Sequence, residues 1–297
     1  MSYPAHALLH PETKKCVVFC HGHYIESMYS LMTSFASAVF PDQQRPKTME
    51  TLEIENYAWV DFFWSTLGRS GIVGQDINLI YDKLQDAGAV DQMLQNIAGH
   101  EVHKQKSALR RWFEKKALMF ILKMTLGHMA ANERNEPDVV LTPDALGGLK
   151  RFIEVQLYNQ LIHEMNDEPP EDIAFIFGHT HKPFVKTMSF ENYKKPVRLY
   201  NSGGWVVDTL QQQKLHGGSV VLVDENLDVV SLNMYREGNY TAAVEEIRSN
   251  GEAPSAFAEQ LRQRIDPNRE PWKGFSTVVE KEVNIRYQNL ASLIKED

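Results

Sequence analysis

A short apolar run that ends at a glycine and two histidines places the strongest constraint on the fold. Residues 173–177, Ile-Ala-Phe-Ile-Phe, are mostly β-branched or aromatic, which predicts a buried strand. Gly178 ends the run, and His179 and His181 follow with one residue between them. That spacing on extended backbone lets both imidazoles converge, and imidazole is the commonest ligand of divalent transition metals. We therefore predict that both histidines bind metal; the alternative is a polar loop with incidental histidines.

The N-terminal part of the chain repeats this pattern. The apolar run at 16–20 ends at His21-Gly22-His23, so a second strand is expected to deliver imidazole at its carboxyl end. By itself, a His-Gly-His tripeptide is more typical of structural or incidental histidines. In open α/β sheets, however, the carboxyl ends of parallel strands meet at one edge, where ligands bind. His21 could therefore lie beside His179, although the two are far apart in the sequence.

Composition narrows the class of protein. The chain has 297 residues, 43% of them hydrophobic, and a net charge of −8, which indicates a globular protein and argues against general nucleic-acid binding. No apolar stretch reaches the roughly 20 residues of a membrane span. Cys16 and Cys20 are too far apart along one strand for a disulfide, so we expect free thiols. Free thiols and the lack of a signal peptide predict a cytoplasmic protein.

The long middle of the chain predicts helices with little strand signal. Apolar periodicity indicates helices at 26–40, 49–67, 76–84, 90–97, 107–131 and 143–165. Thr142 is a plausible N-cap for the last of these, and Pro143 suits its first turn. We therefore expect a mainly helical insertion between the two histidine-bearing strands.

The predicted helix at 107–131 lies in a basic stretch. Seven lysines and arginines fall between residues 104 and 123 against one glutamate, and the apolar run 117–122 lies among them. One interpretation is a lid that offers cations to phosphate and an apolar face to a lipid, with peripheral membrane contact through 104–126. The other interpretation, slightly favoured, is a packed helix with a solvated basic face.

Further strands and a helix are expected in the last third. Residues 197–200 predict a strand, followed by Asn201-Ser202-Gly203-Gly204-Trp205. Adjacent glycines let backbone approach a bound group, which Asn201 and Ser202 could contact; an ordinary strand-to-turn junction explains the segment equally well. Runs at 218–223 and 227–234 predict a hairpin. An apolar stripe at 275–294 predicts a helix that docks on its own domain or on a partner.

Three of these segments together resemble a known family. Gly178-His-Thr-His181-Lys-Pro183, preceded by His21-Gly-His23 and followed by Asn201-Ser-Gly-Gly-Trp205, resembles the last two of five motifs of the calcineurin-like metallophosphoesterases. The resemblance covers roughly 1–30 and 170–235. It implies an α/β fold in which 1–25 and 172–235 form the C-terminal half of a two-sheet sandwich. Residues 26–171 are then a large all-helical insertion, and 236–297 a helical C-terminal extension.

The same resemblance implies a chemistry. The family uses two divalent metal ions, here Mn, Fe, Zn or Ni, to hydrolyse phosphoesters as phosphodiesterases or phosphatases. By resemblance, His21 and His179 would bind one metal and His181 the other. The candidate catalytic residues are His21 and His23, and the candidate substrate contacts are His23, Glu26, Asn201 and Ser202. The insertion is similar in placement to the lid of the UDP-diacylglucosamine pyrophosphatases, so the phosphoester is lipid-linked or soluble, and the protein is cytoplasmic with or without peripheral membrane contact.

One departure from the family pattern bears on activity. The first three family motifs, Asp-x-His, Gly-Asp-x-x-Asp and Gly-Asn-His, have no credible copy in the sequence. In the family they precede the His-Gly-His element, so we expect this chain to be the C-terminal portion of a longer enzyme, with an incomplete site and little activity alone. The competing interpretation is a degenerate, non-catalytic scaffold whose helices and C-terminal stripe bind a protein partner.

Overall fold

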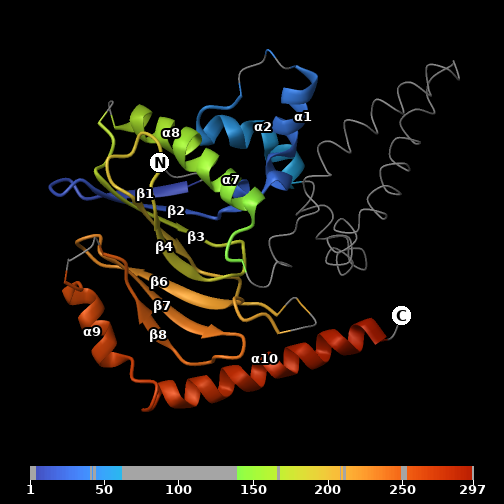
Figure 1. The fold of residues 1–297 in the computed structure, drawn as a ribbon, viewed down its shortest axis with the longest axis vertical. Coiled ribbons are helices and arrows are strands. Elements are labelled where there is room, and N and C mark those ends of the chain that lie inside the picture. Colours follow the sequence, from blue (N-terminus) through green and yellow to red (C-terminus); the bar gives the residue numbers. More distant parts are fainter. Residues whose placement is uncertain are drawn as a thin grey trace, which may run out of the picture. The chain divides into compact units, whose positions relative to one another are not determined.

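The structure of the chain is a computed structural model that describes residues 5–40, 42, 45–61, 139–165, 168–207, 209, 212–248 and 253–295. These residues form a mixed α/β protein with two compact units (Figure 1). Unit 1 comprises Met1–Gly22, Glu136–Leu141 and Leu161–Asp297, and unit 2 comprises His23–Asn135 and Thr142–Gln160. The chain thus enters unit 2 close to the boundary expected at residue 26. Residues 161–171, expected in the insertion, belong to unit 1.

Unit 1 contains a mixed five-stranded sheet. Its strands are β1 (Ala5–Leu9), β2 (Lys15–Cys20), β3 (Asp172–Phe177), β4 (Phe184–Met188) and β5 (Val197–Asn201), in the order β1-β2-β3-β5-β4. The three central strands, β2, β3 and β5, are parallel, and the two edge strands are antiparallel to their neighbours. The strands predicted at 173–177, 16–20 and 197–200 are confirmed. Parallel strands at the centre of a sheet are usually buried on both faces, which fits the apolar runs of β2 and β3.

A second sheet of unit 1 is antiparallel and has three strands. It consists of β6 (Gly217–Val223), β7 (Val229–Arg236) and β8 (Ala243–Glu245). The predicted hairpin is confirmed, and its turn is held by Asp224 Oδ1, which accepts hydrogen bonds from the backbone N–H groups of Asn226 and Asp228 at 3.0 and 2.8 Å. The C-terminal extension was predicted as helical throughout, but β8 pairs with β7. A strand of three residues is too short to show alternation in the sequence.

Side chains of both sheets share one hydrophobic cluster. Its buried members are Val17, Ala174, Ile176, Tyr200, Leu227 and Val229. Tyr200 is fully buried, and its hydroxyl donates to the backbone oxygen of Val229 at 3.0 Å, which satisfies the one polar atom that this side chain brings into the core. The buried thiol of Cys16 lies among the same strands, and burial raises its pKa to about 12. Both cysteines are free, as predicted.

Two helices follow the sheets in unit 1, namely α9 (Ala256–Arg264) and α10 (Trp272–Lys295). The helix predicted at 275–294 lies within α10. From its apolar stripe, Val283 is buried and Tyr287 donates a hydrogen bond to Glu237. The stripe therefore contacts its own unit at these positions.

Unit 2 is helical in its described part. Its elements are η1 (His23–Ile25), η2 (Ser27–Ser30), α1 (Leu31–Val39), α2 (Met49–Asp61), α7 (Pro143–Arg151) and the π-helical segment η5 (Phe152–Leu157). The chain continues directly into α8 (Tyr158–Glu164), so the helix predicted at 143–165 is confirmed. Thr142 caps it by accepting a hydrogen bond from the backbone N–H of Ala145 at 3.2 Å.

Two helices of unit 2 have bounds that differ from the predicted ones. The helix predicted at 26–40 begins only at Leu31, because Glu26 is extended, with φ −93° and ψ 134°, and two 3-10 turns precede the α-helix. The helix predicted at 49–67 is observed as far as Asp61. Residues 62–67, the helices predicted at 76–84, 90–97 and 107–131, and the basic stretch 104–126 lie outside the described residues. Among the helices that are described, none has the length and apolar character to cross a membrane.

Candidate functional site

The rings of His21 and His179 lie next to each other in unit 1. Strands β2 and β3 pair in parallel as far as Phe19 opposite Ile176, so each histidine follows the carboxyl end of one strand. The backbone N–H of Gly178 donates to the backbone oxygen of His21 at 3.2 Å, which extends this pairing beyond the strands. The two imidazole centroids are 5.2 Å apart, with an angle of 71° between the ring planes. The predicted proximity of these histidines is therefore confirmed.

The turn that carries His179 and His181 has an unusual backbone. Both residues are in the left-handed region, with φ of 74° and 60°. A non-glycine residue in this region costs of order 1–3 kcal/mol, and such conformations collect at binding and catalytic sites, where surrounding contacts hold them in place. His179 is buried and His181 is half-buried.

Asn201, at the end of β5, holds this turn in place. Its side-chain nitrogen donates to the backbone oxygen of Gly178 at 3.0 Å and to the hydroxyl of Thr180 at 2.9 Å. Its side-chain oxygen accepts from the backbone N–H of Gly203 at 2.8 Å. Asn201 is fully buried, so its amide is committed to joining the histidine turn to the turn that follows β5. This geometry supports a positioning role, rather than the substrate contact that the sequence suggested.

His181 occupies a different environment from the histidine pair. A Cβ atom at Gly204 would lie 2.4 Å from its ring, so the imidazole packs directly on the backbone of the Gly-Gly turn. The backbone oxygen of His181 accepts from the N–H of Gly217 at 3.3 Å. Ser202 is half-buried beside Gly178, and its backbone bonds Phe177 and Ser219. Gly204 thus makes room for a histidine ring.

The described residues provide an incomplete donor set for metal. Nowhere in this part of the chain do three or more His, Cys, Asp or Glu side chains form a group that could hold an ion. His21 and His179 supply two nitrogen donors, whereas two divalent ions need several more ligands, carboxylates among them. The described residues therefore do not fit a complete two-metal centre, although the pair fits part of one.

Lys182 is a residue of this turn to which the sequence assigned no role. Its side chain is fully buried, and its Nζ donates to the backbone oxygen of Val139 at 2.7 Å. From the sequence, a lysine that directly follows two candidate ligands is expected to be an exposed loop residue, because buried lysines are rare. The contact instead ties the histidine turn to the backbone at Val139, in the same unit.

The remaining candidates, His23 and Glu26, belong to unit 2. The ring of His23 lies 4.0 Å from that of Tyr24 and 5.5 Å from that of Tyr29, between centroids. Its Nε2 is 4.0 Å from a carboxylate oxygen of Glu53, which also accepts a hydrogen bond from Tyr24. Glu26 is buried. These contacts describe a polar and aromatic cluster inside unit 2, and the predicted roles of both residues in catalysis or substrate binding stay predictions.

The histidine pair predicts a pH dependence of stability. Burial of part of the His21 ring lowers its pKa from the usual 6.5, and the neighbouring imidazole of His179 lowers it further. The unfolded chain therefore takes up this proton first, so the contribution of His21 to the free energy of unfolding falls as the pH drops below 6.5 and is constant above it. Urea unfolding of the wild type and of His21→Gln, measured between about pH 8 and about pH 5, tests this. The wild type should lose more stability in acid than the variant, and superimposable profiles would contradict the prediction.

Comparison of the chain with protein-family models, with curated proteins and with solved structures finds no match. Chemical interpretation of the site therefore depends on its residues and their geometry. Two adjacent imidazoles can bind a divalent ion weakly, and the strained turn beside them is held by Asn201 and Lys182.

Proposed function

We propose that the chain contributes part of the metal centre of a phosphoester hydrolase of the calcineurin-like metallophosphoesterase type. The observation that carries the proposal is the His21–His179 pair, with ring centroids 5.2 Å apart where the adjacent parallel strands β2 and β3 end. Ligand sites of open α/β sheets form at this position. His21 and His179 would bind one ion, and His181 would be a ligand of the second.

Three further features support this assignment. The left-handed conformations of His179 and His181 are typical of residues held for function rather than for local stability. The hydrophobic cluster shared by the five-stranded and three-stranded sheets is consistent with part of a two-sheet sandwich. The depressed pKa of His21 keeps its imidazole neutral at physiological pH, which is the form that binds metal.

The donor set limits what the chain does alone. A metal centre of this class supplies a hydroxide nucleophile and neutralises phosphoryl charge. The described residues offer two adjacent imidazoles, so we propose that the centre is incomplete in this chain and that other carboxylate and histidine ligands complete it. The substrate would be a phosphoester, soluble or lipid-linked, and the protein cytoplasmic with or without peripheral contact to a membrane.

Metal titration of the purified full chain tests the proposal. Co²⁺ or Zn²⁺ should bind with an affinity that falls by about tenfold or more in His21→Ala and in His179→Ala. Loss of a residue that merely orients a ligand already costs about 10–100-fold, and loss of a ligand costs at least as much. His163→Ala removes an exposed imidazole from α8 of unit 1 and should leave binding unchanged. Hydrolysis of bis(4-nitrophenyl) phosphate by the metal-loaded chain should stay near background.

Metal binding and phosphoester hydrolysis test different parts of the proposal. If no divalent ion binds, or if His163→Ala weakens binding as much as the other two variants, the histidine pair is no metal site and the non-catalytic scaffold becomes the better interpretation. Hydrolysis that is abolished by His179→Ala would support the function and would show that the centre is complete.

A further inference from the structure

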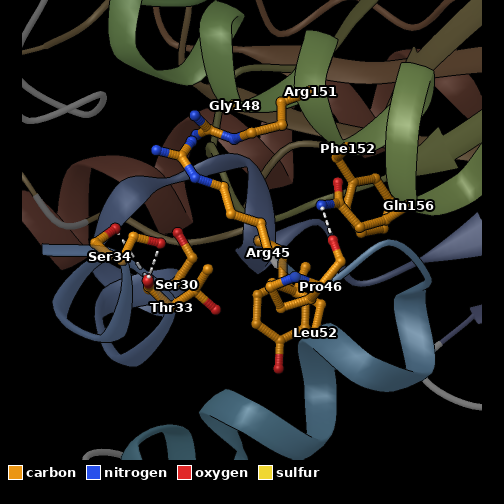
Figure 2. A pocket seen from close by; sticks show the side chains of 12 residues that line it. Ser30, Thr33, Ser34, Arg45, Pro46, Leu52, Gly148, Arg151, Phe152 and Gln156 are labelled. Atoms are coloured by element: carbon orange, nitrogen blue, oxygen red, sulfur yellow. Dashed lines mark hydrogen bonds between the residues drawn. The ribbon is translucent and has the colours of Figure 1, made fainter. Parts of the chain in front are cut away.

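A pocket in unit 2 is lined by two arginines and several hydroxyl groups. It has a volume of about 340 Å³, close to the lower end of the range for small-molecule sites. Arg45 comes from the loop before α2, and Arg151 is the last residue of α7. Figure 2 shows the two side chains extending from these separate elements to the same end of the pocket. The lining residues, all in the described part of unit 2, include no carboxylate.

The two guanidinium groups are available to a ligand. Both side chains are exposed, and neither makes an ion pair or a side-chain hydrogen bond with the described part of the chain. Two cations that line one pocket repel each other unless an anion lies between them. A guanidinium presents a planar fork of N–H donors that matches the oxygens of phosphate, and two forks match its double negative charge.

The loop that carries Arg45 is held by one side chain of η5 and one of α8. Gln156 donates to the backbone oxygen of Pro46 at 3.1 Å, and Asn159 donates to that of Lys47 at 3.1 Å. Gln156 belongs to η5, the π-helical segment that begins directly after Arg151. Single π-helical turns inside α-helices are rare and frequently occur at functional sites. The π-helical segment thus begins directly after Arg151 and, through Gln156, bonds the loop that carries Arg45.

The rest of the lining indicates where each part of a ligand would lie. Ser30 and Ser34 line the same pocket, and each donates to a main-chain oxygen at 3.2 Å (Figure 2). An anionic oxygen is a stronger acceptor and can replace these long bonds. Thr33 bonds Glu55, so the anion belongs at the arginine end and not at Thr33. Leu52 and Phe152 are buried and form an apolar wall.

We propose that this pocket binds a small organic phosphate, with the phosphoryl group between Arg45 and Arg151 and an apolar or aromatic portion against Leu52 and Phe152. The site lies wholly within unit 2 and involves none of the histidines of the metal centre. Whether this pocket binds an organic phosphate therefore does not depend on the proposed hydrolase function.

Calorimetric titration of the full chain with phenylphosphonate tests the proposal, because its C–P bond resists hydrolysis. Phenylphosphonate should bind saturably and benzyl alcohol should not. Arg45→Gln and Arg151→Gln should each weaken binding about tenfold or more, since each removes charge-assisted hydrogen bonds, and the double variant should abolish it. Arg45→Lys should only partly restore binding, because an ammonium lacks the planar fork. Methylphosphonate, which lacks the ring, should bind more weakly than phenylphosphonate.

Lys47→Gln is the matched control. Lys47 is exposed, lies two residues from Arg45 in the same loop and is not part of the lining, so its variant removes the same charge and should keep wild-type affinity. The arginine side chains are exposed and make no ion pair or side-chain hydrogen bond with the described part of the chain, so no variant should unfold below the wild-type temperature. Absence of phenylphosphonate binding, unchanged binding by the double variant, or an equal loss in Lys47→Gln would overturn the site. Equal affinity for both phosphonates would overturn the apolar part of the ligand.

Discussion

Replacing Gly148 with alanine is expected to destabilise unit 2 by about 3 kcal/mol or more, the upper range for overpacking a buried contact. Gly148 is buried in α7, where the backbone of that helix meets the backbone of Ile25. An added Cβ would lie 2.0 Å from the backbone oxygen of Ile25 and 2.8 Å from its carbonyl carbon. Both neighbours are main-chain atoms of a buried residue, so relief of the overlap requires the two elements to separate.

The neighbouring glycine provides a matched control for this substitution. Gly147 lies in the same helix, and a Cβ there would meet no atom within 4 Å. Gly147→Ala should therefore be neutral or stabilise the helix by up to about 1 kcal/mol, the difference in helix propensity between the two residues. Hydrogen exchange of peptides from 23–61 and 142–160 measures the effect within unit 2. Equal protection in the two variants would show that α7 does not pack closely on residue 25.

Replacing Asn201 with alanine is expected to lower the free energy of unfolding of unit 1 by about 2–4 kcal/mol. The substitution removes three buried hydrogen bonds, to Gly178, Thr180 and Gly203, and leaves their partners unsatisfied. An unsatisfied buried group costs about 1–3 kcal/mol, and partial relaxation of the two turns offsets some of the sum. Because Asn201 holds the turn in which His179 is left-handed, affinity for divalent metal should fall as well.

Asn289→Ala separates this effect from the general loss of an amide. Asn289 is exposed on α10, in the same unit, so its removal should change stability by less than about 0.5 kcal/mol. Urea unfolding gives the stability of each variant, and hydrogen exchange of peptides from 172–205 locates the change. Asn201→Ala with wild-type protection of these peptides would contradict the positioning role. Loss of stability without loss of metal binding would show that Asn201 does not position the histidine pair for metal.

Much of the sheet of unit 1 could be predicted from local sequence. The strands β2 and β3 are central and parallel, and their apolar runs are followed by histidine and glycine; β5 is also central but contains Arg198 and ends at Asn201. The helical run from Pro143 was equally clear, because its N-cap is a local signal. The adjacency of His21 and His179 followed from a general property of parallel sheets, although some 150 residues separate them.

Other features depend on contacts between segments remote in sequence. The strand β8 exists because β7 pairs with it, and nothing in Ala243–Glu245 alone predicts a strand. The role of Asn201 depends on hydrogen bonds to residues 21 and 23 positions away. Polar residues at a turn look alike in sequence whether they face solvent or bond a neighbouring turn.

The sequence by itself determined which two strands are followed by histidines, because an apolar run and the residues that end it are local features. A general property of parallel sheets indicated that these strands could lie side by side. Only the tertiary structure decided that His179 and His181 have different surroundings and that Arg45 and Arg151 line one pocket. Which side chains converge depends on left-handed backbone at single residues, on a π-helical segment and on side-chain bonds between distant loops. These features arise from packing of the whole unit and have no periodic pattern in the sequence.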